Sequence, residues 1–367
     1  MKISEQAKLK KSPVEQINAV TSLLSEDVRY NGDWRTVKGA FHPRSLEVIS
    51  KSGYGDCKDF TVAAGAILRT LGFEAHAAWT NRGFDVMERP YNLPVLGFNH
   101  AILHVKKDEK EYWIDPTNFA SFAQGVPDDI ENKLAIILKP SGAVKARTEA
   151  GKSEDKFNKV VLNLNFDKDS LITGTGEIVL KGASSFSMTG AELNGSKQST
   201  EYSLLKWALN ESNISSWGFE PYSLKSRIVK DVTTSFKFTF PWFPVLTSAG
   251  KGFLVSLPPD VPSLVTNRAQ RVSYLNFQGS PYRIVREYHI KGRSVAMESE
   301  FDCQGSSQWA DFSRKFIKNG SDVVLVDDFS LKVRTISPED ISTKLYGDFQ
   351  EKLRSCMQRA VVVFRPN

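Results

Sequence analysis

The segment Gly53-Tyr54-Gly55-Asp56-Cys57-Lys58-Asp59-Phe60 combines a glycine-containing turn with the start of a helix. The glycines allow a tight turn, and Asp56 has the short carboxylate side chain that caps exposed N–H groups at a helix start. Cys57 would then lie in the first helical turn, where the helix dipole favours the nucleophilic thiolate. The segment therefore predicts a rigidly mounted cysteine nucleophile, whereas Cys57 taken alone also fits a small buried cysteine in a helix.

The residues on either side of this segment predict two more features of helical structure. Apolar residues recur after Cys57 at helical spacing, and they are Phe60, Ala63, Ala64, Ile67, Leu68 and Leu71. Gly72 then follows at a position where glycine commonly ends a helix. Upstream, Ser12-Pro13-Val14-Glu15 has the pattern of a capping box with proline in the first turn. The stretch 31–44, which contains Trp34, is predicted to be a loop, and 45–50 a short helix.

Length and composition indicate a globular protein with two domains. The chain has 367 residues, of which 41% are hydrophobic and 25% charged, and one core does not usually extend over such a length. The net charge is +6, with basic and acidic residues interspersed, so no nucleic-acid partner is expected. We predict neither a signal peptide nor a transmembrane segment in this chain. Cys303 and Cys356 can pair in an extracytoplasmic protein, and a packed, helical Cys356 is the alternative.

Two predicted strands, 98–106 and 110–115, form a hairpin with its turn at 106–109. If Val105 pairs with Lys110, His100 lies opposite Asp115, and directly opposed residues have Cβ atoms about 4.5–5.5 Å apart. That separation suits a hydrogen bond between the carboxylate and the imidazole.

Beyond this hairpin the chain changes character. Residues 140–155 are small and polar, which predicts a linker between a domain over 1–145 and a second over 150–367. The second domain is expected to be β-rich and sandwich-like, with a helix near 203–210 and a C-terminal helix that starts at Ser337-Pro338. Its strand candidates are 160–166, 172–180, 223–240, 253–257, 282–290, 294–303 and 323–333.

Cys57, His100 and Asp115 together predict thiol chemistry. A thiol needs a base that holds it as thiolate, and the imidazole needs a carboxylate that fixes its tautomer and stabilises its charge. A zinc site formed by Cys57, His100 and His104 is the alternative, but the aspartate that follows the strand pair explains the same residues better. No metal and no organic cofactor is therefore expected.

Four motifs in consistent order resemble the transglutaminase-like superfamily, and most closely its bacterial branch with a Gly-Asp-Cys-Lys-Asp core. They are Tyr54-Gly55-Asp56-Cys57-Lys58-Asp59, Leu71-Gly72-Phe73-Glu74-Ala75, Phe98-Asn99-His100-Ala101 and Trp113-Ile114-Asp115-Pro116-Thr117. The resemblance covers roughly residues 12–140 and implies an α+β, papain-like core. It implies Cys57 as nucleophile, His100 as base and Asp115 as orienting acid. Trp34, as an oxyanion donor, and Asn99, as a substrate contact, are further candidates.

The function implied by this resemblance is cysteine-dependent acyl transfer on amide bonds of a protein or peptide substrate. Hydrolysis by a protease or amidase is favoured over transglutaminase chemistry. The alternative is an inactive transglutaminase-like scaffold whose second domain binds a partner or a cell-envelope polymer. Members of the branch usually carry another β-rich domain and an export signal before the core. If the chain is a fragment, we therefore expect a periplasmic or extracellular protein. Its oligomeric state is not predicted.

Overall fold

The structure is a computed structural model of the chain. It describes residues 2–32, 42–84, 97–166, 171–222, 226–247, 250–255, 257–266, 273–277, 281–291, 302–320, 322–357 and 361–364. The described residues fall into two units, the first made of 1–151, 185–194 and 224–230 and the second of the remainder. Two short segments from the second half of the sequence thus belong to the first unit. The functional division that we expect at 145–150 stays a prediction.

The first unit contains most of α5 (Ala183–Asn194) and four helices from the N-terminal part of the chain. They are α1 (Lys2–Lys8), α2 (Pro13–Asp27), α3 (Leu46–Ser52) and α4 (Cys57–Thr70). The capping box predicted before α2 is present, because Ser12 Oγ accepts from the Glu15 N–H at 3.2 Å and the Glu15 carboxylate accepts from the Ser12 N–H at 3.0 Å. The sequence did not predict α1, whose Ala7 is fully buried in the core of this unit.

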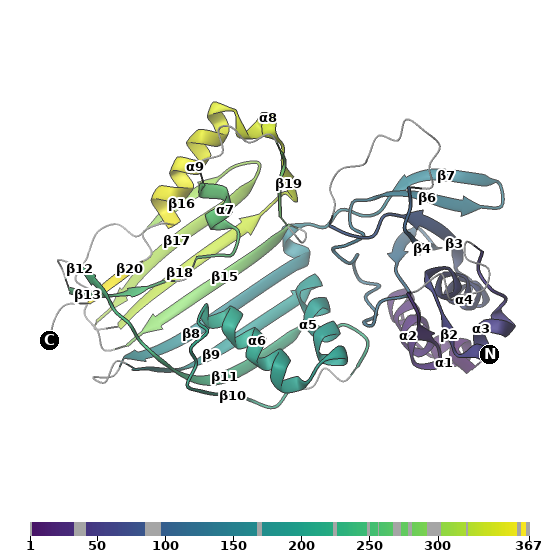
Figure 1. Cartoon of the computed structure of the whole chain (residues 1–367), viewed down its shortest axis with the longest axis horizontal. Coiled ribbons are helices and arrows are strands. Elements are labelled where there is room, and N and C mark those ends of the chain that lie inside the picture. Colours follow the sequence, from purple (N-terminus) through teal and green to yellow (C-terminus); the bar gives the residue numbers. More distant parts are fainter. Residues whose placement is uncertain are drawn as a thin grey trace. The chain divides into compact units, whose positions relative to one another are not determined.

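Helix α4 packs on a sheet with the strand order β5-β4-β3-β6-β7, and α1, α2 and α3 pack on α4 (Figure 1). The strands of this sheet are β3 (Glu74–Thr80), β4 (His100–Lys107), β5 (Lys110–Ile114), β6 (Leu134–Lys139) and β7 (Gly142–Arg147). Apolar residues of α2, α4, β3, β4 and β5 share one core. A smaller cluster around Ile102 and Trp113 packs with Ile130 and Ile137. A short parallel pair, β1 (Arg29–Tyr30) and β2 (Tyr54–Gly55), precedes α4.

The register of the β4–β5 hairpin differs from the predicted one by two residues. Lys107 pairs with Lys110, and Val105 pairs with Tyr112, because the turn contains only two residues, of which Asp108 has a φ of 54°. His100 is therefore not directly opposite Asp115. A shift of two residues preserves the face on which each side chain lies, so the predicted neighbourhood of the two side chains survives the correction.

The predicted linker at 140–155 is wrong in its first half. Residues 142–147 form β7, which pairs with β6 along its whole length, and the Thr148 N–H donates to the Lys133 carbonyl at 2.9 Å. β7 lies at the sheet edge with nearly all of its side chains exposed. Backbone pairing alone holds such a strand, so its composition resembles that of a linker.

The second unit confirms the expected β-rich half, and its principal sheet has eight strands in the order β10-β11-β9-β8-β15-β18-β17-β16. Its neighbouring pairs are antiparallel except β8 and β15. Helices α6, α7 and α9 lie along one face of this sheet (Figure 1). The strands are β8 (Lys156–Phe166), β9 (Leu171–Gly182), β10 (Ser216–Phe219), β11 (Val232–Pro241), β15 (Tyr282–Ile290), β16 (Cys303–Ser306), β17 (Ala310–Asn319) and β18 (Asp322–Leu331).

Shorter strands and the helices complete the described chain. The predicted last helix is divided in two, since α8 ends at Ile341 and α9 begins at Lys344. The predicted turn at 167–170 and most of the strand at 294–303 lie outside the described residues. The remaining elements are η1 (Ser153–Asp155), α5 (Ala183–Asn194), α6 (Lys197–Leu209), β12 (Val245–Thr247), β13 (Gly250–Leu254), α7 (Val261–Val265), β14 (Leu275–Asn276), β19 (Thr335–Ile336), α8 (Pro338–Ile341), α9 (Lys344–Met357) and β20 (Val361–Phe364).

A disulfide and a buried ion pair stabilise the second unit. Cys303 and Cys356 form a disulfide that joins β16 to α9, which decides between the two alternatives left open by the sequence. Arg314 on β17 and Asp327 on β18 are both buried and share two hydrogen bonds of 2.6 and 2.7 Å. The bidentate geometry compensates part of the cost of burying two charges.

Candidate active site

The start of α4 holds Cys57 through a reciprocal set of hydrogen bonds. Asp56 is the N-cap, and its carboxylate accepts from the N–H groups of Lys58 at 3.0 Å and Asp59 at 3.3 Å. The Asp59 carboxylate in turn accepts from the Asp56 N–H. Gly55 is required here by close approach, since a Cβ at this position would lie 2.8 Å from the Asp59 Cβ. Cys57, the first residue of the helix, is partly exposed and is the free cysteine of the chain.

Arg44, which no sequence pattern singles out, contacts the same turn. Its backbone N–H and its Nε donate to the two oxygens of Asp59, each at 2.8 Å. Its guanidinium also donates to the Tyr54 carbonyl and lies over the Tyr54 ring, 4.6 Å from the centroid. The Asp59 side chain is fully buried, so its charge is compensated by this arginine. These contacts fix the backbone that presents Cys57.

His100 lies between Cys57 and Asp115. Its Nε2 is 2.8 Å from Asp115 Oδ2, and Cys57 is close enough to the same imidazole to help raise its pKa. Because Nε2 faces the carboxylate, Nδ1 is the nitrogen left for the thiol. One turn after Cys57, Thr61 Oγ1 donates to the Ala101 carbonyl at 3.0 Å, which ties α4 to the strand residue next to His100.

The charges of this group are set by burial and by one another. Burial by itself would lower the pKa of His100, but the charge and hydrogen bond of Asp115, with a contribution from Cys57, outweigh it and raise the pKa to about 9. Burial would raise the pKa of Asp115, but the charge and hydrogen bond of His100 and the charge of Arg82 lower it to about 2. Thr117 donates to Asp115 Oδ1 from its N–H at 3.0 Å and its hydroxyl at 2.7 Å. The arrangement favours an imidazolium beside a carboxylate at neutral pH.

The two further candidates have different outcomes. Trp34 lies outside the described residues, so its role stays a prediction. Both ends of the Asn99 side-chain amide are bonded to the backbone of Arg82: Oδ1 accepts from the Arg82 N–H at 2.7 Å and Nδ2 donates to its carbonyl at 3.0 Å. Each end of this exposed amide can form one more hydrogen bond, so a substrate contact by Asn99 stays a prediction.

Tyr30 is an aromatic residue near the thiol that the sequence analysis did not single out. It pairs with Gly55 in the β1–β2 ladder, and its ring packs edge-on against Phe60 with centroids 5.8 Å apart. Burial, followed by the negative charges of Cys57 and Asp115, raises the pKa of Tyr30 to about 12. The phenol is therefore a neutral hydrogen-bond donor beside the candidate nucleophile. A parallel pairing over 24 intervening positions has no local sequence signal.

The zinc site considered as an alternative does not match the structure. In the described ranges, no group of three or more His, Cys, Asp or Glu side chains is arranged to hold a metal ion. His104 instead places Nε2 3.2 Å from Glu111 Oε2 and stacks at a tilt on Trp113. In the same described ranges, no helix has the length and apolar composition to span a membrane.

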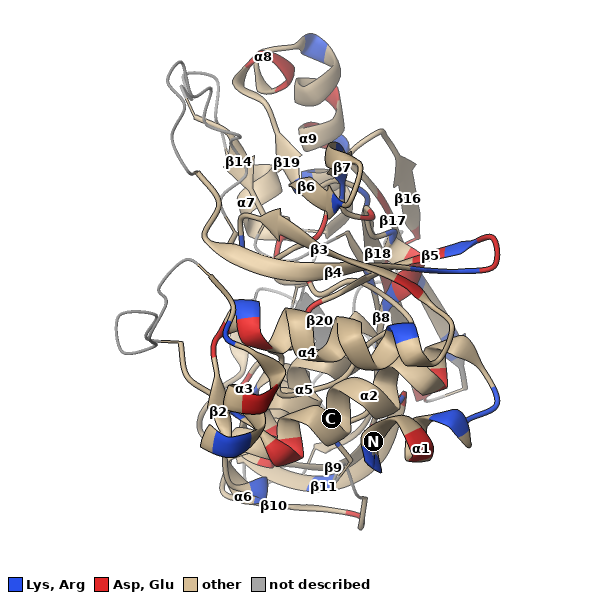
Figure 2. Cartoon of the chain, turned by 90° about the vertical axis from the view of Figure 1, so that its right-hand side faces the viewer, with Lys and Arg blue, Asp and Glu red and all other residues tan. Residues whose placement is uncertain are grey.

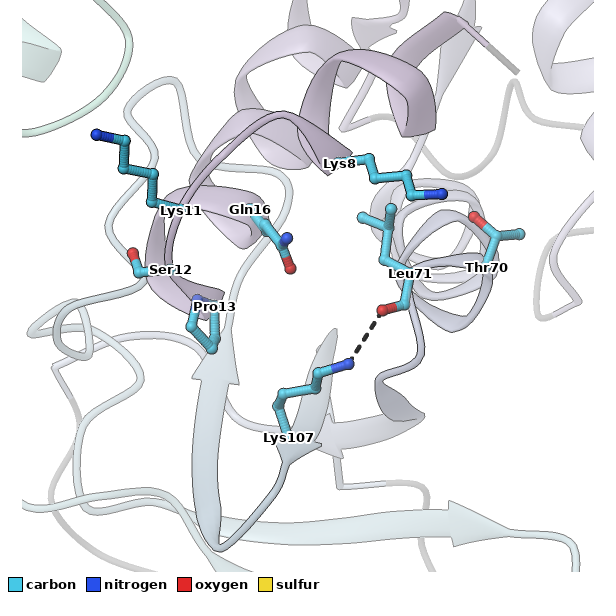
Figure 3. A pocket seen from close by; sticks show the side chains of 8 residues that line it. All are labelled: Lys8, Lys11, Ser12, Pro13, Gln16, Thr70, Leu71 and Lys107. Carbon is cyan, nitrogen blue, oxygen red and sulfur yellow. Dashed lines mark hydrogen bonds between the residues drawn. The ribbon is translucent and has the colours of Figure 1, made fainter.

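A surface pocket of about 370 Å³ lies at the far end of α4 from Cys57 (Figure 3). Its lining includes Lys8, Lys11 and Lys107, and Lys107 Nζ donates to the Leu71 carbonyl at 3.1 Å. α4 has 14 residues and is therefore about 21 Å long, so this pocket is separate from the candidate active site.

Along α1, α3 and the β4–β5 hairpin, basic and acidic residues are interspersed (Figure 2), as the sequence indicated.

One known family matches part of this chain. Residues 2–116 match the family model described as the transglutaminase-like superfamily, and Cys57, His100 and Asp115 all lie within that range. The predicted resemblance to this superfamily is thereby confirmed over residues 2–116. No curated protein matches the chain.

One similar solved structure is the crystal structure of a protein from Parabacteroides distasonis ATCC 8503 described as a “putative protease”. It shares 10% sequence identity with this chain, with a TM-score of 0.53, and the match covers 99% of this chain and 55% of the other. At that identity the likeness shows the fold alone. This chain spans about half the length of that protein.

Proposed function

We propose that this protein is a cysteine-dependent acyl-transfer enzyme that acts on amide bonds of a protein or peptide, with Cys57, His100 and Asp115 as a catalytic triad. One observation carries the proposal: the buried His100 imidazole faces Asp115 Oδ2 through Nε2 at 2.8 Å, and Cys57 is close enough to the same imidazole to help raise its pKa. This arrangement supports Cys57 as nucleophile, His100 as base and Asp115 as orienting acid.

The first half of the reaction uses the charges described above. With its pKa raised to about 9, His100 is protonated at neutral pH and stabilises the Cys57 thiolate. The thiolate attacks the amide carbonyl carbon, and the oxyanion that forms accepts from the Cys57 backbone N–H, which lies in the first turn of α4. His100 then gives its proton to the leaving nitrogen, the C–N bond breaks, and a thioester with Cys57 remains.

The second half decides the class of enzyme. Water attacks the thioester with His100 as general base in a hydrolase, whereas an amine attacks it in a transglutaminase. Asp115 stays ionised throughout and holds the imidazole in one orientation. We favour hydrolysis, and the description of the structural neighbour as a “putative protease” supports this choice. The Cys303–Cys356 disulfide supports an oxidising compartment, since such bonds persist there.

The test is to trap the acyl-enzyme from a library of peptides that includes glutaminyl peptides. Mass spectrometry of the wild-type chain should locate the adduct on the Cys57 peptide, and released acid or amine-exchanged product distinguishes hydrolysis from transamidation. Cys57→Ala should abolish both adduct and turnover while the fold remains, because a small residue at this helix position is tolerated. Undiminished turnover in Cys57→Ala would exclude the mechanism. An unacylated, iodoacetamide-resistant Cys57 in the wild-type chain would favour the scaffold alternative.

A further inference from the structure

Arg82 connects to both sides of the His100–Asp115 pair. It lies two residues beyond the end of β3, and 35% of its side chain is exposed. We propose that Arg82 is a positioning residue that holds the His100 imidazole and the Asp115 carboxylate in the relative orientation that their hydrogen bond requires. This inference rests on the proposed function, because it assigns a role within the same triad.

The guanidinium of Arg82 fixes the segment that carries Asp115. Nε donates to Asp129 Oδ2 at 2.6 Å, Nη1 donates to Thr117 Oγ1 at 3.2 Å, and Nη2 donates to Asn118 Oδ1 at 2.9 Å. Nη1 also lies 3.4 Å from Asp115 Oδ2, the oxygen that faces His100. The rigid, planar guanidinium determines the direction of all these contacts at once, which the single ammonium group of a lysine cannot do.

The backbone of Arg82 fixes the residue next to His100. Its N–H and its carbonyl are both bonded to the side-chain amide of Asn99, at 2.7 and 3.0 Å. His100 itself pairs with Thr80, the last residue of β3. One residue therefore contacts the chain immediately before the imidazole through its backbone and the chain around the carboxylate through its side chain.

Such a connection is needed because the sheet does not hold the two partners together. The pairing of β4 with β5 ends at Leu103 and Ile114, so His100 lies three residues beyond the last pair on one strand and Asp115 one residue beyond it on the other. Backbone pairing fixes distances only within a ladder. Outside it, the contacts of Arg82 supply the missing constraint.

A purely electrostatic role for Arg82 makes a different prediction. A cation beside Asp115 competes with His100 for the carboxylate, so removal of the arginine charge alone should strengthen the attraction between Asp115 and the imidazolium. A positioning role predicts the reverse, because the carboxylate would no longer be directed at Nε2. The hydrogen bond between His100 and Asp115 is therefore the quantity to measure.

The experiment uses the full chain with Arg82→Met, which removes the charge and the donors, and Arg82→Lys, which keeps the charge. Two measurements are made without substrate: the low-field proton resonance of the His100–Asp115 hydrogen bond, and the rate of Cys57 alkylation by iodoacetamide at mildly acidic pH. We expect both variants to lose the resonance and to be alkylated at least about tenfold more slowly. Arg69→Met is the matched control, since Arg69 donates to the Ala75 carbonyl at 2.8 Å in the same unit; it should leave both measurements unchanged.

A second variant keeps the inference testable if the arginine variants do not fold. Asp129→Asn weakens the anchor of Arg82 Nε without altering Arg82 or Asp115, and it should broaden the resonance and slow alkylation to a smaller extent. Restoration of both measurements by Arg82→Lys, or their persistence in Arg82→Met, would overturn the positioning role. Acylation of the wild-type Cys57 by a peptide reports on the proposed function separately, so failure of one idea is distinguishable from failure of the other.

Discussion

Replacement of Asp115 by asparagine should lower the pKa of His100, so that its imidazole is neutral at neutral pH. The substitution removes the negative charge that faces Nε2 at 2.8 Å but keeps a side chain of the same shape, whose oxygen can still accept from the Thr117 N–H and hydroxyl. Burial then acts on the imidazole without compensation, and burial disfavours the charged form of a histidine.

The size of the effect follows from the pKa of His100. Its rise from 6.5 to about 9 corresponds to a preference of about 3 kcal/mol for the charged form, since tenfold in proton affinity is about 1.4 kcal/mol. Because Asp115 supplies the largest contributions that raise the pKa and burial opposes them, we expect the pKa of His100 in Asp115→Asn to fall to 6.5 or below.

The assay is a titration of the histidine ring carbons by NMR on selectively labelled protein. The chain has five histidines, and the His100 resonance is the one that disappears in His100→Gln. A Cys57→Ala background is used because a thiol and an imidazole that interact titrate as a pair. Asp108→Asn, which removes a carboxylate from the turn of the same hairpin, is the control.

Two results would refute the reasoning. If His100 titrates near 6.5 in the parent protein, Asp115 does not stabilise the imidazolium. If the pKa stays near 9 in Asp115→Asn, another group supplies the charge. A shift of equal size in Asp108→Asn would point to a general effect of net charge rather than to the contact.

Three further predictions concern stability. The wild-type chain should have a higher free energy of unfolding than Asp115→Asn, and the difference should be largest between pH 3.8 and 6.5. It should decline as the pH rises through about 9, where His100 deprotonates, and as the pH falls toward 2, where Asp115 protonates. Denaturant titrations at several pH values measure this difference. Loss of the Cys303–Cys356 bond, which spans a separation of 53 residues, should cost about 4 kcal/mol. A melting temperature of the double alanine variant equal to that of the wild type under non-reducing conditions would contradict this. Asp327→Ala leaves a buried arginine unpaired and should cost about 3–5 kcal/mol, whereas joint replacement of both partners by apolar residues should cost much less in the same unfolding assay.

The local structure around the candidate nucleophile could be predicted from the sequence because its signals are local. A capping residue, an acid three positions later and apolar residues at helical spacing lie within one short segment around Cys57. The hairpin that carries His100 and Asp115 is similarly local, since both strands and the turn are contiguous. Its register was misjudged by two residues because a two-residue turn and a four-residue turn leave the same alternation of side chains.

A buried charge explains why one strand of the second unit was not predicted from the sequence. β17 was not predicted because Arg314 occupies an inward position and interrupts the apolar alternation that identifies a strand. Its partner, Asp327, is on the neighbouring strand, and only the pairing of β17 with β18 shows that the charge is compensated.

Only the tertiary structure decided the contacts between residues that are distant in the chain and have no periodic pattern. Arg44 and Arg82 look like ordinary surface arginines in the sequence, yet the fold directs one at Asp59 and the other at Asp115 and Asp129. The sequence by itself determined the chemical groups at the candidate site and the local elements that carry them. The tertiary structure decided which distant charges hold those groups in place, because the energy of such contacts depends on separation and burial in space.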